Sequence, residues 1–117
     1  MENNKVKNQK LRVWWLPQVG ASATFYIPVT SVEEGKKIID LLSAYDCFQL
    51  NHRIKGDYCN TGGLEMWDEK EQNWVDWEYE DKDLYYDSVD EYCEEVSSQT
   101  EMLNEFSKAL FEQVHFD

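Results

Sequence analysis

Residues 11–29, LRVWWLPQVGASATFYIPV, decide the fold. Residues 11–16 are rich in β-branched and aromatic side chains and stop at Pro17, which cannot donate a hydrogen bond to a neighbouring strand. Residues 20–22 predict a turn, and residues 24–29 predict a second strand. Two such strands joined by a short connection predict a β-hairpin.

A helix is predicted directly after this hairpin. Ser31 and Glu34 have the spacing of a capping box, in which the serine hydroxyl accepts from the Glu34 backbone N–H while the Glu34 side chain reaches back. Behind the cap, apolar side chains recur at helical spacing as far as about Ala44. They are Ile38, Ile39, Leu41, Leu42 and Tyr45. This pattern predicts an amphipathic helix.

The remainder of the chain predicts short strands and a second long helix. The expected elements are a third strand at 46–50, a turn-rich loop at 51–63, a hairpin of 63–67 and 73–78 around a charged tip, an acidic loop or edge at 78–87, a capped turn at 87–92 and a helix at 99–114. Residues 1–10 are polar and have no periodicity, which predicts a flexible N-terminal arm. No linker divides residues 11–117, so the sequence predicts a single α+β domain with a small antiparallel sheet and two main helices.

Charge is distributed unevenly along the chain. The formal net charge is −13, from 11 basic and 24 acidic residues. Residues 1–55 carry eight basic and five acidic residues, whereas residues 56–117 carry three basic and nineteen acidic ones. A field this negative repels bulk nucleic acid and anionic membranes, so neither is expected as a partner.

The sequence also predicts a cytoplasmic protein. No apolar run approaches the roughly 18 residues of a membrane-spanning helix, and no apolar region of a signal peptide follows the polar N-terminus. The three cysteines, Cys47, Cys59 and Cys93, make no paired framework, so they are expected to be reduced thiols.

Catalytic and metal motifs are absent from the sequence. His52 and His115 are not spaced for zinc, and the chain has no phosphate-binding or dinucleotide-binding glycine motif. Residues 81–92 begin like a calcium loop, but Tyr86 replaces the required glycine and Tyr92 the required acid. We therefore expect neither an enzyme nor a cofactor.

Residues 51–63, NHRIKGDYCNTGG, combine side chains that suit a phosphorylated ligand. An arginine fork and a lysine charge suit phosphate, a tyrosine ring suits stacking on a base, and aspartate or asparagine suits a base edge or a ribose hydroxyl. The residues that carry this prediction are Arg53, Lys55, Asp57, Tyr58 and Asn60. The alternative is a turn-rich connection in which the arginine pairs with one of the many carboxylates.

The adjacent residues Trp14 and Trp15 point to opposite faces of the predicted strand. One of them is expected in the core, and the other against a subunit or a planar ligand. Five tryptophans and seven tyrosines are more than a core of this size readily hides, which favours a homo-oligomer.

Several ordered motifs resemble a widespread family of small phage proteins. They are residues 11–18, 25–29, 45–49, 57–65 and 74–77. We identify the chain as similar to the anti-CBASS sponge family, whose members sequester cyclic-oligonucleotide signals of host defence without cleaving them. The resemblance implies an oligomer, with a tetramer favoured, in the host cytoplasm, and a cyclic dinucleotide ligand such as 3′3′-cGAMP. The predicted ligand-binding residues are Trp15, Gln18, Arg53, Lys55, Asp57, Tyr58 and Asn60; all lie within residues 11–78, the stretch that the resemblance covers, and Lys55 is chosen for its charge.

Three alternatives remain at this stage. A second phage sponge family, which binds the cyclic ADP-ribose isomers of Thoeris defence, has similar features. The dense acidic stretch from Glu65 to Glu95 also suits a DNA mimic, in which carboxylates replace phosphates in the channel of a host DNA-binding protein. A small enzyme that degrades the signal is the third. A sponge for a doubly charged ligand needs its few cations pooled, so the ligand sites are expected at subunit boundaries.

Overall fold

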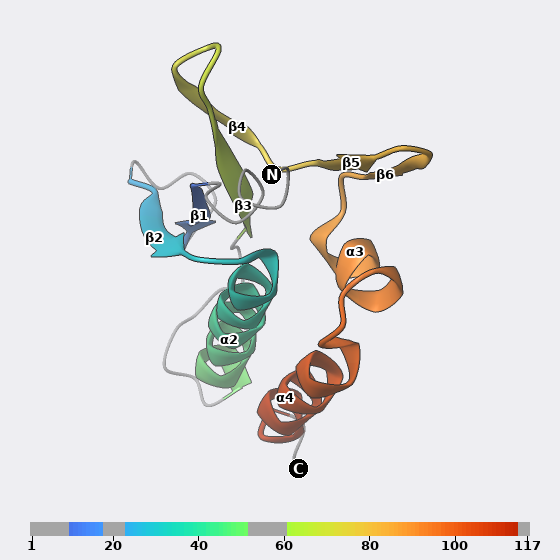
Figure 1. Ribbon diagram of the computed structural model, residues 1–117. Helices are drawn as coiled ribbons and strands as arrows, with labels where there is room; N and C mark the ends of the chain where they lie inside the picture. The colour runs from blue at the N-terminus through green and yellow to red at the C-terminus, as the bar shows by residue number, and fades with distance from the viewer. Residues whose placement is uncertain (1–9, 18–22, 52–60, 115–117) are drawn as a thin grey trace.

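An antiparallel four-stranded sheet forms around the predicted hairpin (Figure 1). The computed structural model describes residues 10–17, 23–51 and 61–114. The sheet has the order β2-β1-β3-β4. Its strands are β1 (Leu11–Leu16), β2 (Phe25–Val29), β3 (Thr61–Asp68) and β4 (Asn73–Asp76). The prediction of a β1–β2 hairpin is confirmed, with Trp14 opposite Tyr26.

The second half of the chain adds a separate hairpin and two helices. They are β5 (Tyr79–Asp81), β6 (Leu84–Tyr86), α3 (Val89–Glu95) and α4 (Thr100–Glu112). The predicted hairpin around the charged tip and the predicted last helix are both confirmed. The acidic loop or edge forms the two-stranded β5–β6 sheet, and the capped turn forms a third helix, which begins at its N-cap Ser88. The α+β class is confirmed.

The helix α2 (Val32–Asn51) begins at the predicted cap. The Glu34 backbone N–H donates to Ser31 Oγ (3.0 Å), as expected. The Glu34 carboxylate reaches back one residue further, to the backbone N–H and the hydroxyl of Thr30 (2.7 and 2.8 Å). These two hydrogen bonds favour the charged form and lower the pKa of Glu34.

The prediction of a strand at residues 46–50 is wrong, because α2 continues through this segment. Five alternating residues are too few to separate a strand period from a helical one, and no glycine or proline interrupts the chain between Lys36 and Asn51. The end of the helix is tied to the far end of the chain. Asn51 Nδ2 donates to the backbone carbonyl of Val114 (2.9 Å).

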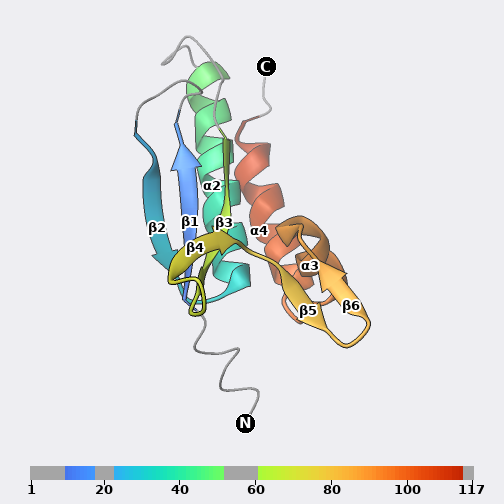
Figure 2. The same ribbon diagram turned by 90° about the horizontal axis from the view of Figure 1, so that it is seen from above.

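The inner face of the sheet packs on α2, and α4 packs along α2 (Figure 2). The core consists of residues from the inward positions of the strands, together with a tryptophan that follows β4. They are Leu11, Val13, Val29, Leu64 and Trp77. Ile38 and Ile39 of α2 pack against this cluster. Burial of these apolar side chains supplies the main driving force for folding.

The outer face of the sheet carries an arginine held between two rings. The Arg12 guanidinium carbon lies 3.8 Å from the centre of the Tyr26 ring and 4.2 Å from that of Trp74. Arg12 Nε donates to Glu65 Oε1 (2.8 Å). These contacts join β2, β1, β3 and β4 across their exposed side, so this arginine is used within the fold.

Two predictions about organisation lie beyond this description. Residues 1–9 of the predicted N-terminal arm lie outside the described residues. The predicted homo-oligomer, favoured as a tetramer, stays a prediction. Among the described residues, no helix combines the length and the hydropathy that crossing a bilayer requires.

Candidate functional site: an aromatic and acidic pocket

Only one of the predicted ligand-binding residues lies in the described part of the chain. Trp15 points to the inner face of the sheet, and its side chain is 7% exposed. Its ring lies so close to Gly62 that a Cβ at that position would overlap it. The other predicted residues, Gln18, Arg53, Lys55, Asp57, Tyr58 and Asn60, lie outside the described residues. Of the adjacent tryptophans, Trp15 is the core residue, and Trp14 is half-buried on the opposite face.

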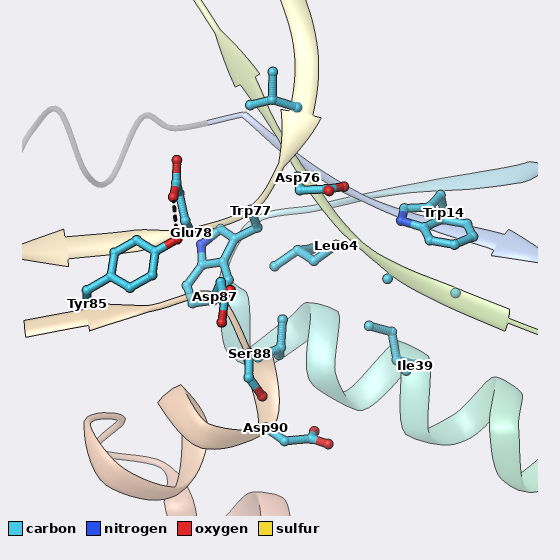
Figure 3. Close-up of a pocket in the computed structure, with 14 residues that line it drawn as sticks. Trp14, Ile39, Leu64, Asp76, Trp77, Glu78, Tyr85, Asp87, Ser88 and Asp90 are labelled. Atoms are coloured by element: carbon cyan, nitrogen blue, oxygen red, sulfur yellow. Dashed lines mark hydrogen bonds between the residues drawn. The ribbon is translucent and has the colours of Figure 1, made fainter.

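A pocket of about 640 Å³ lies where the sheet meets the second half of the chain (Figure 3). One wall is the first half of β3, with Gly62, Gly63 and Leu64, and α2 contributes Ile39. The remaining walls come from residues 75–78 and 85–90. These segments include the end of β4 and the connection from β6 to α3. The pocket therefore lies between the sheet with α2 and the second half of the chain.

The pocket exists because β4 is shorter than β3. β4 pairs with residues 65–68 of β3 only, and the Trp77 backbone N–H adds one more bond to the Leu64 carbonyl (3.0 Å). The chain then turns away into β5. Among the described strands, residues 61–63 of β3 pair with β1 alone. An open stretch of strand edge therefore borders the pocket.

Three aromatic side chains line the pocket. The Trp14 ring packs on the backbone of Gly63, where an added Cβ would lie 2.8 Å from Trp14 Nε1. Trp77 is 6% exposed and meets the Tyr92 ring edge-on at 5.4 Å. Tyr85 is 56% exposed, and its hydroxyl donates to Glu78 Oε1 (2.8 Å). This hydrogen bond, with the negative charge around it, raises the pKa of Tyr85.

Among the described residues that line the same pocket, four are carboxylates and none is basic. They are Asp76, Glu78, Asp87 and Asp90. Lys36, on α2, pairs with Asp90 (3.1 Å) and with Asp40 (2.8 Å). Burial acts to lower the pKa of Lys36, but its hydrogen bonds and ion pairs outweigh this effect and raise it. The side chains of Asp76 and Asp87 make no hydrogen bond or ion pair to any residue that the structure describes.

The chemistry of this pocket suits the binding of a cation. Within residues 10–17, 23–51 and 61–114, no group of carboxylates, cysteines or histidines converges closely enough to hold a metal ion. The nearby thiol of Cys93 is buried, and burial raises its pKa to about 11, so it is protonated at neutral pH. Aromatic faces beside carboxylates suit an organic cation. The expectation that the protein is not an enzyme stays a prediction.

Two features of the sequence pointed toward this pocket. One of the adjacent Trp14 and Trp15 was expected to lie outside the core, and the acidic residues are concentrated after Glu65. The contribution of Asp87 to Asp90 was not predicted, because the return of this segment to the sheet edge depends on the β5–β6 hairpin.

Comparison with known proteins places the chain in a family. A family model described as superinfection exclusion gene product 17 matches residues 10–98. The chain belongs to this family. A superinfection exclusion protein of Salmonella phage P22 is 41% identical to it over 102 residues, which cover 78% of this chain and 96% of the P22 protein. No solved structure matches the chain. All the described residues that line the pocket lie within the region that the gene product 17 family model matches, whereas α4 follows it.

Membership of the gene product 17 family corrects the resemblance drawn from the sequence. The assignment to the anti-CBASS sponges is wrong, and so are a cyclic-nucleotide sponge, a Thoeris-signal sponge and a DNA mimic as functions. The phage origin of the family is confirmed. Residues such as Trp15 and Gly62, which the motifs contain, pack the sheet. Motifs of this kind indicate a shared fold and carry no information on a shared ligand.

Proposed function

We propose that the protein acts in superinfection exclusion, the block that a resident phage sets against a second phage. The observation that carries this proposal is the 41% identity to the P22 superinfection exclusion protein across 96% of that protein. We place this action in the host cytoplasm, and we propose that it operates by stoichiometric binding of another protein.

The pocket supports binding as the mode of action. It gathers three aromatic rings and four carboxylates on one open concave surface, and the described residues around it offer no metal site and no reactive thiol. Tyrosine and tryptophan are the residues that most often carry the energy of protein–protein contacts. A binding role also needs none of the catalytic motifs that the sequence lacks.

A plating experiment tests this function. The full chain is expressed from a plasmid in a Salmonella strain, and the efficiency of plating is measured for a panel of challenging phages. The control plasmid carries the same gene with an early stop codon. We expect fewer plaques of at least one challenging phage only where the protein is made.

Adsorption of the challenging phage is measured in the same cells. Because the proposed site of action is the cytoplasm, adsorption should be equal with and without the protein. Unchanged plating of the whole panel, or increased plating, would overturn the proposed function. Reduced adsorption would overturn its placement inside the cell.

A further inference from the structure

We propose that the pocket binds an extended, arginine-containing segment of a partner protein, with the guanidinium group between the aromatic rings and the carboxylates. The inference deepens the proposed function. It rests on that function in one respect, which is that the partner is a protein involved in exclusion. Three observations carry it: the rings and charges of the pocket, an arginine held by the same residue types elsewhere in this chain, and the open edge of β3.

The charges of the pocket select a cation. Four carboxylates line it, and only Asp90 has a described basic partner, Lys36. No group of described residues converges as metal ligands do. A guanidinium group is large and planar, so it can meet separated carboxylates with different N–H groups while its face lies on an aromatic ring. The pocket supplies such rings at Trp14, Trp77 and Tyr85.

The chain already holds one arginine in this manner. On the outer face of the sheet, Arg12 lies between Tyr26 and Trp74 and donates to Glu65. The combination of two rings and a carboxylate is therefore sufficient to hold a guanidinium group in this protein. The pocket offers the same chemistry with no described arginine or lysine among its lining residues.

The edge of β3 indicates a peptide segment as the bearer of the arginine. On the side of β3 that faces β1, the Trp67 N–H donates to the Lys10 carbonyl. On the opposite side, the Leu64 carbonyl accepts from the Trp77 N–H. Backbone groups of alternate residues in a strand point to alternate sides, so those of Gly62 point to the same side as those of Leu64. β4 has ended there, and an extended backbone can pair with this edge.

The size of the pocket fits the same occupant. A volume of about 640 Å³ exceeds what one guanidinium group fills and falls in the range of ordinary ligand sites. One arginine side chain would fill part of the cavity while the backbone of the same segment pairs with the edge of β3.

The direct test measures affinity for a blocked hexapeptide of alternating arginine and valine, by calorimetry with the full chain. The site variant is the double substitution Asp76→Asn with Asp87→Asn. The matched control is Glu71→Gln with Asp83→Asn, two exposed carboxylates in the turns of the β3–β4 and β5–β6 hairpins. Both variants lose the same charge, and thermal unfolding checks that both are folded.

We expect the site variant to weaken binding roughly tenfold, because each lost carboxylate removes a charge-assisted contact. The control variant should bind nearly as wild type. Replacing the arginines of the peptide with lysines should also weaken binding, since an ammonium group cannot stack on a ring or pair with a carboxylate through two parallel hydrogen bonds. Equal losses in the two variants would show general attraction to an acidic surface and overturn the proposal, as would no binding by wild type.

The plating experiment separates this inference from the proposed function. If wild type excludes no phage, the proposed function fails, and the peptide measurement still decides whether the pocket binds arginine. If the site variant loses peptide binding yet excludes as wild type does, the pocket is not the site of exclusion, and the proposed partner is overturned. Loss of both activities in the site variant alone supports the inference.

Discussion

The two halves of the molecule are held together by different means. The four-stranded sheet and α2 share a core of apolar side chains, in which Val13 is fully buried. The β5–β6 hairpin and α3 contribute three tyrosines, Tyr79, Tyr86 and Tyr92, which pack on the edge of that core and whose ring centres lie 4.9 to 6.4 Å apart. Carboxylates surround these rings, with nine acidic residues between Glu78 and Glu95.

The difference shows where an acidic protein can place its charge. Carboxylates are costly to bury in an apolar core, but at the surface they can accept hydrogen bonds from tyrosine hydroxyls, as Glu95 does from Tyr86 (2.8 Å). The β5–β6 hairpin and α3, here called the tyrosine half, thus present aromatic rings and negative charge on the same surface. The pocket lies at the border, where the sheet supplies a strand edge and the tyrosine half supplies carboxylates.

The largest expected effect contrasts one residue from each half. Leu64→Ala removes a core side chain and should lower the free energy of unfolding by about 2–5 kcal/mol. Tyr85→Ala removes an exposed ring and should cost much less. Urea unfolding measures both changes. Similar losses of unfolding free energy would contradict the contrast between the apolar core of the sheet and the exposed rings of the β5–β6 hairpin.

A second contrast compares the two helix caps. The hydroxyl of Ser31 caps the long helix α2, and that of Ser88 caps the short helix α3. Ser31→Ala should lower the free energy of unfolding by about 1 kcal/mol. Ser88→Ala should lower it less, because global unfolding depends less on a short helix at the surface. Threonine at each position, which retains the hydroxyl, is the control.

A smaller energy is expected from one of the contacts between the halves. Trp77 of the core meets Tyr92 of α3 edge-on. A double-mutant cycle with Trp77→Leu and Tyr92→Leu should give a coupling energy of about 0.5–1.5 kcal/mol. A coupling near zero would mean that this ring contact adds nothing to the other contacts between the halves, such as the hydrogen bond from the Ser97 hydroxyl to Glu33 (2.6 Å).

The smallest effect is a dependence on pH. The hydrogen bond to Glu95 raises the pKa of Tyr86, so the folded state keeps the phenol proton longer than the unfolded chain does. Stability should therefore fall as pH rises above about 10, the ordinary tyrosine pKa, toward the raised value. Tyr86→Phe should reduce this fall, and an identical pH profile in the variant would contradict the assignment.

Much of the sheet half could be predicted from sequence, and much of the tyrosine half could not. β-branched and aromatic runs mark β1 and β2, and Ser31 with Glu34 marks the start of α2. The alternation at residues 46–50 was misleading, because packing of α2 against α4 extends the helix. The strands β5 and β6 have three residues each and lie among charges, so no periodicity marked them.

The candidate site was harder to predict than the fold. The residues chosen for an anionic ligand were basic and clustered in sequence, whereas the pocket is acidic and assembled from β1, β3, α2 and the segment 75–90. Such a site depends on where β4 ends relative to β3, which is a property of strand pairing. One of Trp14 and Trp15 was expected outside the core, but neither the choice of Trp14 nor its neighbours across the pocket were predicted.

The central claim is that arginine enters the pocket that Trp14 and Trp77 help to line. The most direct measurement follows the indole N–H signals of the five tryptophans by NMR while the arginine–valine peptide is added. We expect the signals of Trp14 and Trp77 to shift, and those of Trp67 and Trp74, which meet edge-on at the β3–β4 hairpin, to stay in place. Shifts confined to Trp67 and Trp74, or no shift at saturating peptide, would contradict the claim.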